Sequence, residues 1–243
     1  MNHQPVISLI EARELSAGYG AIVVVRDLDL TVYPGEVVAL LGANGAGKTT
    51  TLLSLAGQLR PRSGTVLFNG KPDNTPMHRR ANRGMAFVSE SRSVFTRLTA
   101  AQNLAIGRRC DVDRAMSLFP PLRALADRRG GLLSGGEQQM LTLARALARP
   151  TKLLLADELS LGLAPKSVDL LLAAVRRAAD EGMGALVVEQ HVHRVLQIAD
   201  RVYVLRRGRV EFTGTAEEAR SNLDEIQKHY LATGGGPNAH EHR

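Results

Sequence analysis

A glycine-rich segment near the start of the chain has the residue types and spacing of a phosphate-binding loop. It reads Gly42, Ala43, Asn44, Gly45, Ala46, Gly47, Lys48, Thr49, with Thr50 following. Glycine lets a backbone wrap closely around a ligand, and N–H groups at the start of a helix attract anions. Lys48 can place its charge on the β and γ phosphates, and the Thr49 hydroxyl can bind Mg²⁺. The segment therefore predicts a nucleoside triphosphate site.

Two acidic residues follow an apolar run much later in the chain. Asp157 and Glu158 come directly after Leu153, Leu154, Leu155 and Ala156. At the end of a buried strand, Asp157 can hold Mg²⁺, and Glu158 can act as a general base or orient the attacking water. Together with the phosphate loop, this pair predicts a nucleotide-hydrolysing or phosphoryl-transferring enzyme. The two motifs alone leave kinase, GTPase, helicase and transporter open.

A third motif runs from Leu133 through Ser134, Gly135, Gly136 and Glu137 to two glutamines. A serine N-cap with a glutamate three residues later explains a helix start, but it does not explain two adjacent glycines. The motif resembles the signature sequence of ABC ATPases. In that family the signature of one subunit caps the nucleotide bound by its partner. The resemblance implies a site that contains ATP and is completed by a second ABC ATPase subunit, in a homodimer or a heterodimer.

The resemblance extends from Glu14 to Leu231 and assigns further residues. It places Tyr19 where the family stacks an aromatic ring on adenine, and Glu90 where most members have a metal-contacting glutamine. The family's switch histidine aligns with Gln190, and His191 follows it, so either residue remains a candidate. Leu159 replaces the proline that usually follows the catalytic glutamate, which should loosen that turn.

Within the family, the sequence is most similar to the second ATPase of branched-chain amino acid importers. The similarity rests on the phosphate loop, on Ser-Gly-Gly-Glu-Gln-Gln-Met, on Gly-Leu-Ala-Pro and on Val-Glu-Gln. It implies transmembrane permease subunits as partners and, indirectly, a solute-binding protein. Importers of urea and short amides remain possible. The stretch from Asn103 to Phe119 is several residues shorter than in the amino acid subgroup, a difference that bears on the substrate rather than on the ATPase chemistry. A non-transport ABC ATPase usually has coiled-coil insertions or tandem ATPase domains, and neither is present.

Bulk composition is that of a globular enzyme. The chain has 243 residues, 44% hydrophobic and 23% charged, and a single cysteine, Cys110, which excludes an internal disulfide. No apolar run reaches the roughly 18 residues that a membrane helix needs. The net charge of +7 favours anionic ligands, but few aromatics accompany it, so we expect no nucleic acid partner. We expect a cytoplasmic protein that is peripheral on the inner face of the membrane.

The elements that must position these motifs follow from periodicity. Three short apolar runs, at 37–41, 153–156 and 185–188, are typical of strands buried on both faces of a parallel sheet. Because ligands of such sheets bind beyond the carboxyl ends of the strands, one shared site is expected. Alternation at 28–32 predicts an antiparallel strand, residues 169–180 a helix, and residues 202–212 a hairpin turning at Arg207-Gly208.

The expected fold class is an α/β P-loop NTPase of the ABC ATPase type, with a parallel-sheet core, an antiparallel β edge and a helical insert. We expect one ATPase domain over residues 1–233, with the helical subdomain at about 91–148. Residues 234–243 are rich in glycine and then polar, which predicts a disordered tail.

Overall fold

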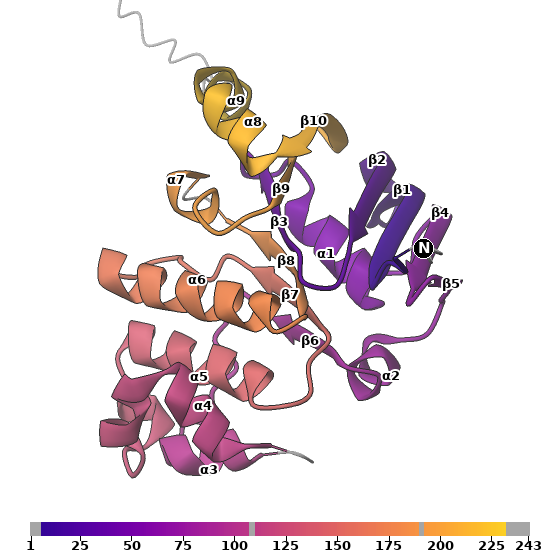
Figure 1. The fold of residues 1–243 in the computed structure, drawn as a ribbon. Helices are drawn as coiled ribbons and strands as arrows, with labels where there is room; N and C mark the ends of the chain where they lie inside the picture. The colour runs from indigo at the N-terminus through magenta and orange to yellow at the C-terminus, as the bar shows by residue number, and fades with distance from the viewer. Residues whose placement is uncertain (1–5, 107–109, 190–191, 232–243) are drawn as a thin grey trace, which may run out of the picture.

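The computed structural model describes residues 6–106, 110–189 and 192–231 and contains two β-sheets (Figure 1). The larger sheet has six strands in the order β10-β9-β3-β8-β7-β6. The strands β9, β3, β8, β7 and β6 run parallel to their neighbours, and β10 pairs antiparallel with β9. Their bounds are β3 Val37–Gly42, β6 Met85–Val88, β7 Leu153–Asp157, β8 Gly184–Val188, β9 Arg201–Arg206 and β10 Arg209–Thr215.

The smaller sheet is antiparallel and has the order β2-β1-β4-β5. Its strands are β1 Ile10–Tyr19, β2 Ile22–Val32, β4 Ser63–Phe68 and β5 Lys71–Pro72. The alternation read from residues 28–32 corresponds to the end of β2, where Leu28, Leu30 and Val32 are buried. The expected antiparallel β edge is therefore confirmed.

Helices cover both faces of the six-stranded sheet. Helix α1 (Lys48–Ala56) lies between the two sheets, and α5 (Gly135–Leu147) and α6 (Pro165–Asp180) pack on the opposite face (Figure 1). Strand β3 shows why two cores form. Val37, Ala39 and Leu41 belong to the core on the α5 and α6 side, whereas Val38 and Leu40 belong to the core around α1, because successive side chains of a strand point to opposite faces.

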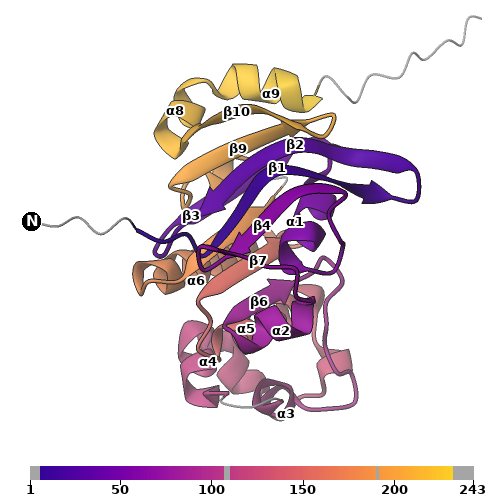
Figure 2. The same ribbon diagram turned by 90° about the vertical axis from the view of Figure 1, so that its right-hand side faces the viewer.

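The segment between β6 and β7 is helical, as expected. It contains α3 (Ala100–Ala105), α4 (Val112–Leu118), the 3-10 helices η1 (Pro120–Leu125) and η2 (Gly130–Leu132), and α5. In Figure 2 these helices lie at the opposite end of the molecule from α8 (Ala216–Ser221) and α9 (Leu223–Leu231). The short helices α2 (Met77–Asn82) and α7 (Val192–Val195) complete the set in the described residues. The exact limits of a separate helical subdomain and of the ATPase domain stay predictions.

The apolar runs give the correct strands, and the sheet adds one that they did not indicate. Strand β6 is itself a short apolar run, Met85–Val88, but it was not identified as a strand from the sequence; Ala86 and Phe87 in its middle are only half-buried. Helix α6 begins at Pro165, four residues before its expected start, because proline is favourable in the first turn of a helix. The expected hairpin is present, with positive φ at Arg207 and Gly208. The tail expected to be disordered lies outside the described residues.

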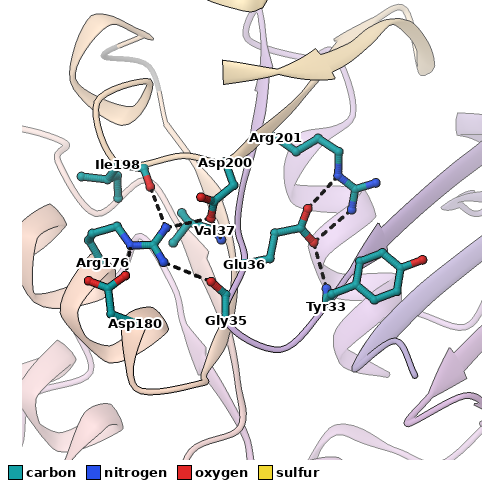
Figure 3. A network of polar contacts seen from close by, with 9 residues as sticks. All are labelled: Tyr33, Gly35, Glu36, Val37, Arg176, Asp180, Ile198, Asp200 and Arg201. Atoms are coloured by element: carbon teal, nitrogen blue, oxygen red, sulfur yellow. Dashed lines mark hydrogen bonds and ion pairs between the residues drawn. The ribbon is translucent and has the colours of Figure 1, made fainter. Parts of the chain in front are cut away.

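A polar network closes the amino ends of the parallel strands (Figure 3). Arg176 of α6 donates to the carbonyl oxygens of Gly35 and Ile198 and pairs with the carboxylates of Asp180 and Asp200. Beside it, Arg201 pairs with Glu36. These charges hold α6 and the starts of β3 and β9 together, so the amino edge of the sheet is a structural junction.

Candidate nucleotide site

The phosphate loop joins the carboxyl end of β3 to the start of α1. At Gly42, φ is +153°, and a Cβ atom would lie 2.4 Å from the carbonyl oxygen of Leu205, so the neighbouring strand β9 leaves no room for a side chain. Gly47 is the N-cap of α1 with φ of +109°, a conformation that L side chains rarely adopt. The two glycines let the chain turn sharply and aim the first N–H groups of α1 into the loop.

Lys48 is buried at the first position of α1. Its Nζ atom donates to the carbonyl oxygens of Gly42, at 2.8 Å, and Ala43, at 3.1 Å, so the side chain curls back over the loop. Burial lowers the pKa of Lys48, and the nearby carboxylates of Glu158 and Asp157 oppose that shift. An anion placed in the loop would offer this desolvated ammonium a stronger partner than two carbonyl groups.

Asp157 is the last residue of β7 and is only 4% exposed. Burial raises its pKa, and the charges of Glu158 and Glu90 raise it further. A hydrogen bond from Thr49 and the charge of Lys48 act in the opposite direction. The Oδ1 atom of Asp157 is buried and has no hydrogen-bond partner. The carboxylate therefore faces a place where a cation would be stabilised.

A cavity opens above the loop and brings several of the predicted residues together. Val24, Asn44, Gly45, Gly47, Lys48, Thr49, Thr50, Glu90, Glu158 and Leu161 line it. Residues of the phosphate loop thus share one cavity with two of the three acidic candidates, Glu90 and Glu158, whereas the third, Asp157, is not among the lining residues. Val24 and Leu161 were not identified as site residues from the sequence. Leu161 could have been found from its position shortly after the acidic pair, whereas nothing in the sequence distinguishes Val24 from other residues of strand β2.

The residues at the cavity fit Mg²⁺ that arrives with a nucleotide. Across residues 6–106, 110–189 and 192–231, no group of three His, Cys, Asp or Glu side chains could hold a metal alone. Magnesium commonly takes one or two protein oxygens and completes its shell with phosphates and water. Thr49 and the unpartnered oxygen of Asp157 supply such oxygens, and Glu90 offers another carboxylate at the cavity wall.

The signature segment starts α5 and does not line this cavity. Ser134 is exposed and forms a capping box with Glu137: each side chain accepts a hydrogen bond from the other's backbone N–H. A Cβ atom at Gly135 would lie 2.7 Å from a guanidinium nitrogen of Arg92, and one at Gly136 would lie 3.0 Å from Ser167 Oγ. The capping box explains the helix start, and Ser167 leaves little room for a side chain at Gly136; at Gly135 the near atoms are the end of the flexible Arg92 side chain. None of residues 134–137 lines the cavity around Lys48.

Other predicted residues are not brought to the cavity. Tyr19 ends β1 with 49% of its surface exposed and is not among the lining residues. Gly42, Ala43 and Ala46 shape the loop from below without lining the cavity. Gln190 and His191 lie outside the described residues. The roles of Tyr19 in adenine stacking and of Gln190 or His191 as the switch residue therefore stay predictions.

The sequence profile of the ABC transporter family matches residues 25–160, more than half of the chain. This chain belongs to that family. Among characterised relatives, the branched-chain amino acid transport ATP-binding protein BraG of Pseudomonas aeruginosa is 39% identical over 86% of this chain and 94% of its own. The probable LivF of Archaeoglobus fulgidus is 36% identical over 86% and 93%.

The lipopolysaccharide export ATP-binding protein LptB of Haemophilus influenzae is also similar, at 34% identity over 93% of this chain and 98% of its own. A solved ATP-binding subunit of an ABC transporter superimposes with a TM-score of 0.78 at 27% identity, over 90% of this chain and 98% of that one. These likenesses confirm the expected fold class, the α/β ABC ATPase fold.

As a member of this family, the chain is an ABC transporter ATPase subunit that binds and hydrolyses ATP. Such subunits pair as dimers and work with membrane permease components. In the described part of this chain, every helix is too short or too polar to cross a bilayer.

Proposed function

We propose that this chain drives the import of branched-chain amino acids, as a peripheral subunit on the inner face of the cell membrane. The observation that carries the proposal is its likeness to BraG and LivF, which extends over nearly the full length of each relative. Its partners would be a second ATPase subunit, permease subunits and, through them, a solute-binding protein. The similarity supports the proposal because it covers the whole ATPase. A match in the phosphate loop alone would not, since all members of the family share that loop.

In the proposed site, the phosphate loop from Gly42 to Thr50 surrounds the phosphates of ATP, and Lys48 leaves its two carbonyl partners to contact the β and γ phosphates. Thr49 and Asp157, with Glu90, would hold Mg²⁺, which neutralises charge on the phosphates when bound. Glu158, at the cavity wall, accepts a proton from the attacking water or orients it. Tyr19 would stack on adenine.

The other half of the proposed site comes from a second subunit. Ser134 and the glycines after it lie at the exposed start of α5, where N–H groups and a hydroxyl can meet an anion. Because these residues are absent from the cavity around Lys48 in the same chain, they are available to the nucleotide of a partner. Gln190 or His191 would act as the switch residue.

A second candidate function is lipopolysaccharide export, since LptB aligns with a still larger share of this chain than BraG does. The two functions differ in direction and in substrate but need the same ATPase chemistry. The ATPase site therefore cannot distinguish them, and the experiment must follow the solute.

Uptake of radiolabelled leucine by cells from the native host, with and without this chain, tests the proposal. Deletion should lower leucine uptake at least about tenfold, and the wild-type chain should restore it, whereas Glu158→Gln should not, because a lost general base slows turnover about a hundredfold. Glu225→Gln, a change at an exposed position of α9, is the control and should restore uptake. Normal leucine uptake after deletion, with lipopolysaccharide missing from the cell surface, would replace import by export.

A further inference from the structure

The turn after β7 holds Glu158 in an unusual backbone conformation. Its φ is +49°, in the left-handed region that residues other than glycine rarely occupy. The Glu158 N–H donates to the carbonyl oxygen of Val188, the last residue of β8, at 2.9 Å. A residue in such a conformation persists only where its surroundings fix it.

A buried carboxylate reaches the turn from the neighbouring strand. Glu189 follows β8 directly and is 0% exposed. Ser160, itself 2% exposed, donates twice to it: its backbone N–H to Oε1 at 3.1 Å, and its hydroxyl to Oε2. A hydrogen bond to a charged acceptor is about twice as strong as one between two neutral groups, and both are stronger in the protein interior than in water. The pair is thus a firm link between the ends of β7 and β8.

Leu159, between the two polar residues, is buried in the core on the α5 and α6 side. The sequence suggests that a leucine here, where the family usually has proline, loosens the turn. In the structure the turn is anchored on each side of Leu159, by Val188 on one side and Glu189 on the other. Tertiary contacts therefore supply the restraint that a proline ring would otherwise give.

We propose that Glu189 is a positioning residue that holds Glu158 in its working orientation through Ser160. The carboxylate fixes Ser160, two residues beyond Glu158, while β8 fixes the Glu158 N–H, so the turn between them has little freedom to relax. This inference rests on the proposed catalytic role of Glu158. The phosphate loop is a separate segment, so loss of the link should leave ATP binding intact and slow the hydrolysis step.

The test compares steady-state ATP hydrolysis of full-length variants at one protein concentration. Ser160→Ala removes the hydroxyl donor and should lower kcat about ten- to a hundredfold, as expected for a misplaced catalytic group, while KM for MgATP changes less than about twofold. Ser160→Thr keeps the hydroxyl and should restore most of kcat. Adding Glu189→Ala to Ser160→Ala should lower kcat less than the two single effects multiplied, because both changes break one link.

Ser8 provides a matched control at the far end of the fold. It is also a buried serine that donates to a carboxylate, Glu11, at 3.1 Å. Ser8→Ala should leave kcat unchanged. Hydrogen exchange gives a second readout: amides of residues 158–163 should exchange faster in Ser160→Ala than in the wild type, with α1 unchanged.

Glu158→Gln, measured beside them, separates two kinds of failure. If Glu158→Gln is slow and Ser160→Ala has the kcat of the wild type, the positioning role of Glu189 is wrong and the site assignment stands. If Glu158→Gln itself hydrolyses ATP at the wild-type rate, the assignment of Glu158 is wrong, and the role of Glu189 is rejected with it. A rise in KM with unchanged kcat in Ser160→Ala would also overturn the proposal.

Discussion

Asp157 carries a carboxyl group that is buried beside two other acidic side chains, Glu158 and Glu90. Burial raises its pKa, so the folded protein binds a proton at this position more tightly than the unfolded chain does. Stability contributed by such a group is lost as the pH rises through the range between the unfolded and folded pKa values. At neutral pH, well above the pKa of the unfolded chain, the buried Asp157 carboxyl therefore opposes folding, and a bound cation would offset that cost.

Replacing Asp157 by asparagine should raise the Tm of the nucleotide-free protein at neutral pH, because a neutral amide of similar shape takes the place of a desolvated acidic group. The gain should shrink as the pH falls toward the raised pKa, where the wild-type carboxyl is itself protonated. Apparent Mg²⁺ affinity in the presence of ATP should fall about tenfold or more. Thermal unfolding between pH 5 and 8 and a Mg²⁺ titration measure these effects.

Asp127→Asn, at an exposed position of the helical insert, is the comparison for Asp157→Asn. It should change neither the Tm nor the Mg²⁺ titration. A variant at Asp157 that is less stable than the wild type at neutral pH, or whose advantage grows on acidification, would contradict this account of the buried carboxyl.

At the scale of elements, helix α5 begins with a capping box that also occurs elsewhere in the chain. Ser134 and Glu137 cap α5, and Thr215 and Glu218 cap α8 in the same way. Removing an N-cap hydroxyl costs about 1 kcal/mol of stability wherever the helix lies. The two helices therefore allow the structural role of Ser134 to be separated from its proposed contact with a partner's nucleotide.

We expect Ser134→Ala and Thr215→Ala each to lower the free energy of unfolding by about 1 kcal/mol in urea titrations. Only Ser134→Ala should also lower ATP turnover, by at least about tenfold, because it removes a donor aimed at the phosphates of the opposing site. Equal turnover of the two variants would reduce Ser134 to a helix cap and withdraw the signature role.

At the scale of the whole molecule, the two proposed halves of the site do not form one cavity within a single chain, since residues 134–137 do not line the cavity around Lys48. Activity then depends on association, and an active dimer held partly by its ligand gives a specific activity that rises with protein concentration. A fully assembled site in the monomer would give no such dependence.

Mixing two inactive variants tests this arrangement. Lys48→Ala lacks the cation for the phosphates, and Ser134→Arg blocks the signature, so each alone should hydrolyse ATP slowly. In a mixed dimer the Ser134→Arg subunit keeps Lys48 and faces an intact Ser134, so one competent site forms and activity should reappear. ATP hydrolysis measured across mixing ratios should peak near equal amounts. A flat response, together with full activity of Ser134→Arg alone, would contradict the face-to-face dimer.

The sequence by itself determined the features that depend on neighbours along the chain. The phosphate loop is recognisable because glycine spacing, Lys48 and Thr49 must be contiguous to surround a phosphate. The buried strands β3, β7 and β8 are recognisable because a strand covered on both faces must be apolar throughout. The turn at Arg207-Gly208 follows from the backbone preferences of tight hairpins.

Only the tertiary structure decided what depends on contacts between distant segments. The apolar run of β6 is only four residues long, and its pairing with β7 shows that it is a strand of the sheet. The raised pKa of Asp157 depends on burial and on Glu90, 67 positions earlier. The link from Glu189 to Ser160 joins residues 29 positions apart, and neither residue type signals it. Such interactions arise because folding places the ends of neighbouring strands side by side, and no local rule of sequence specifies which side chains will then meet.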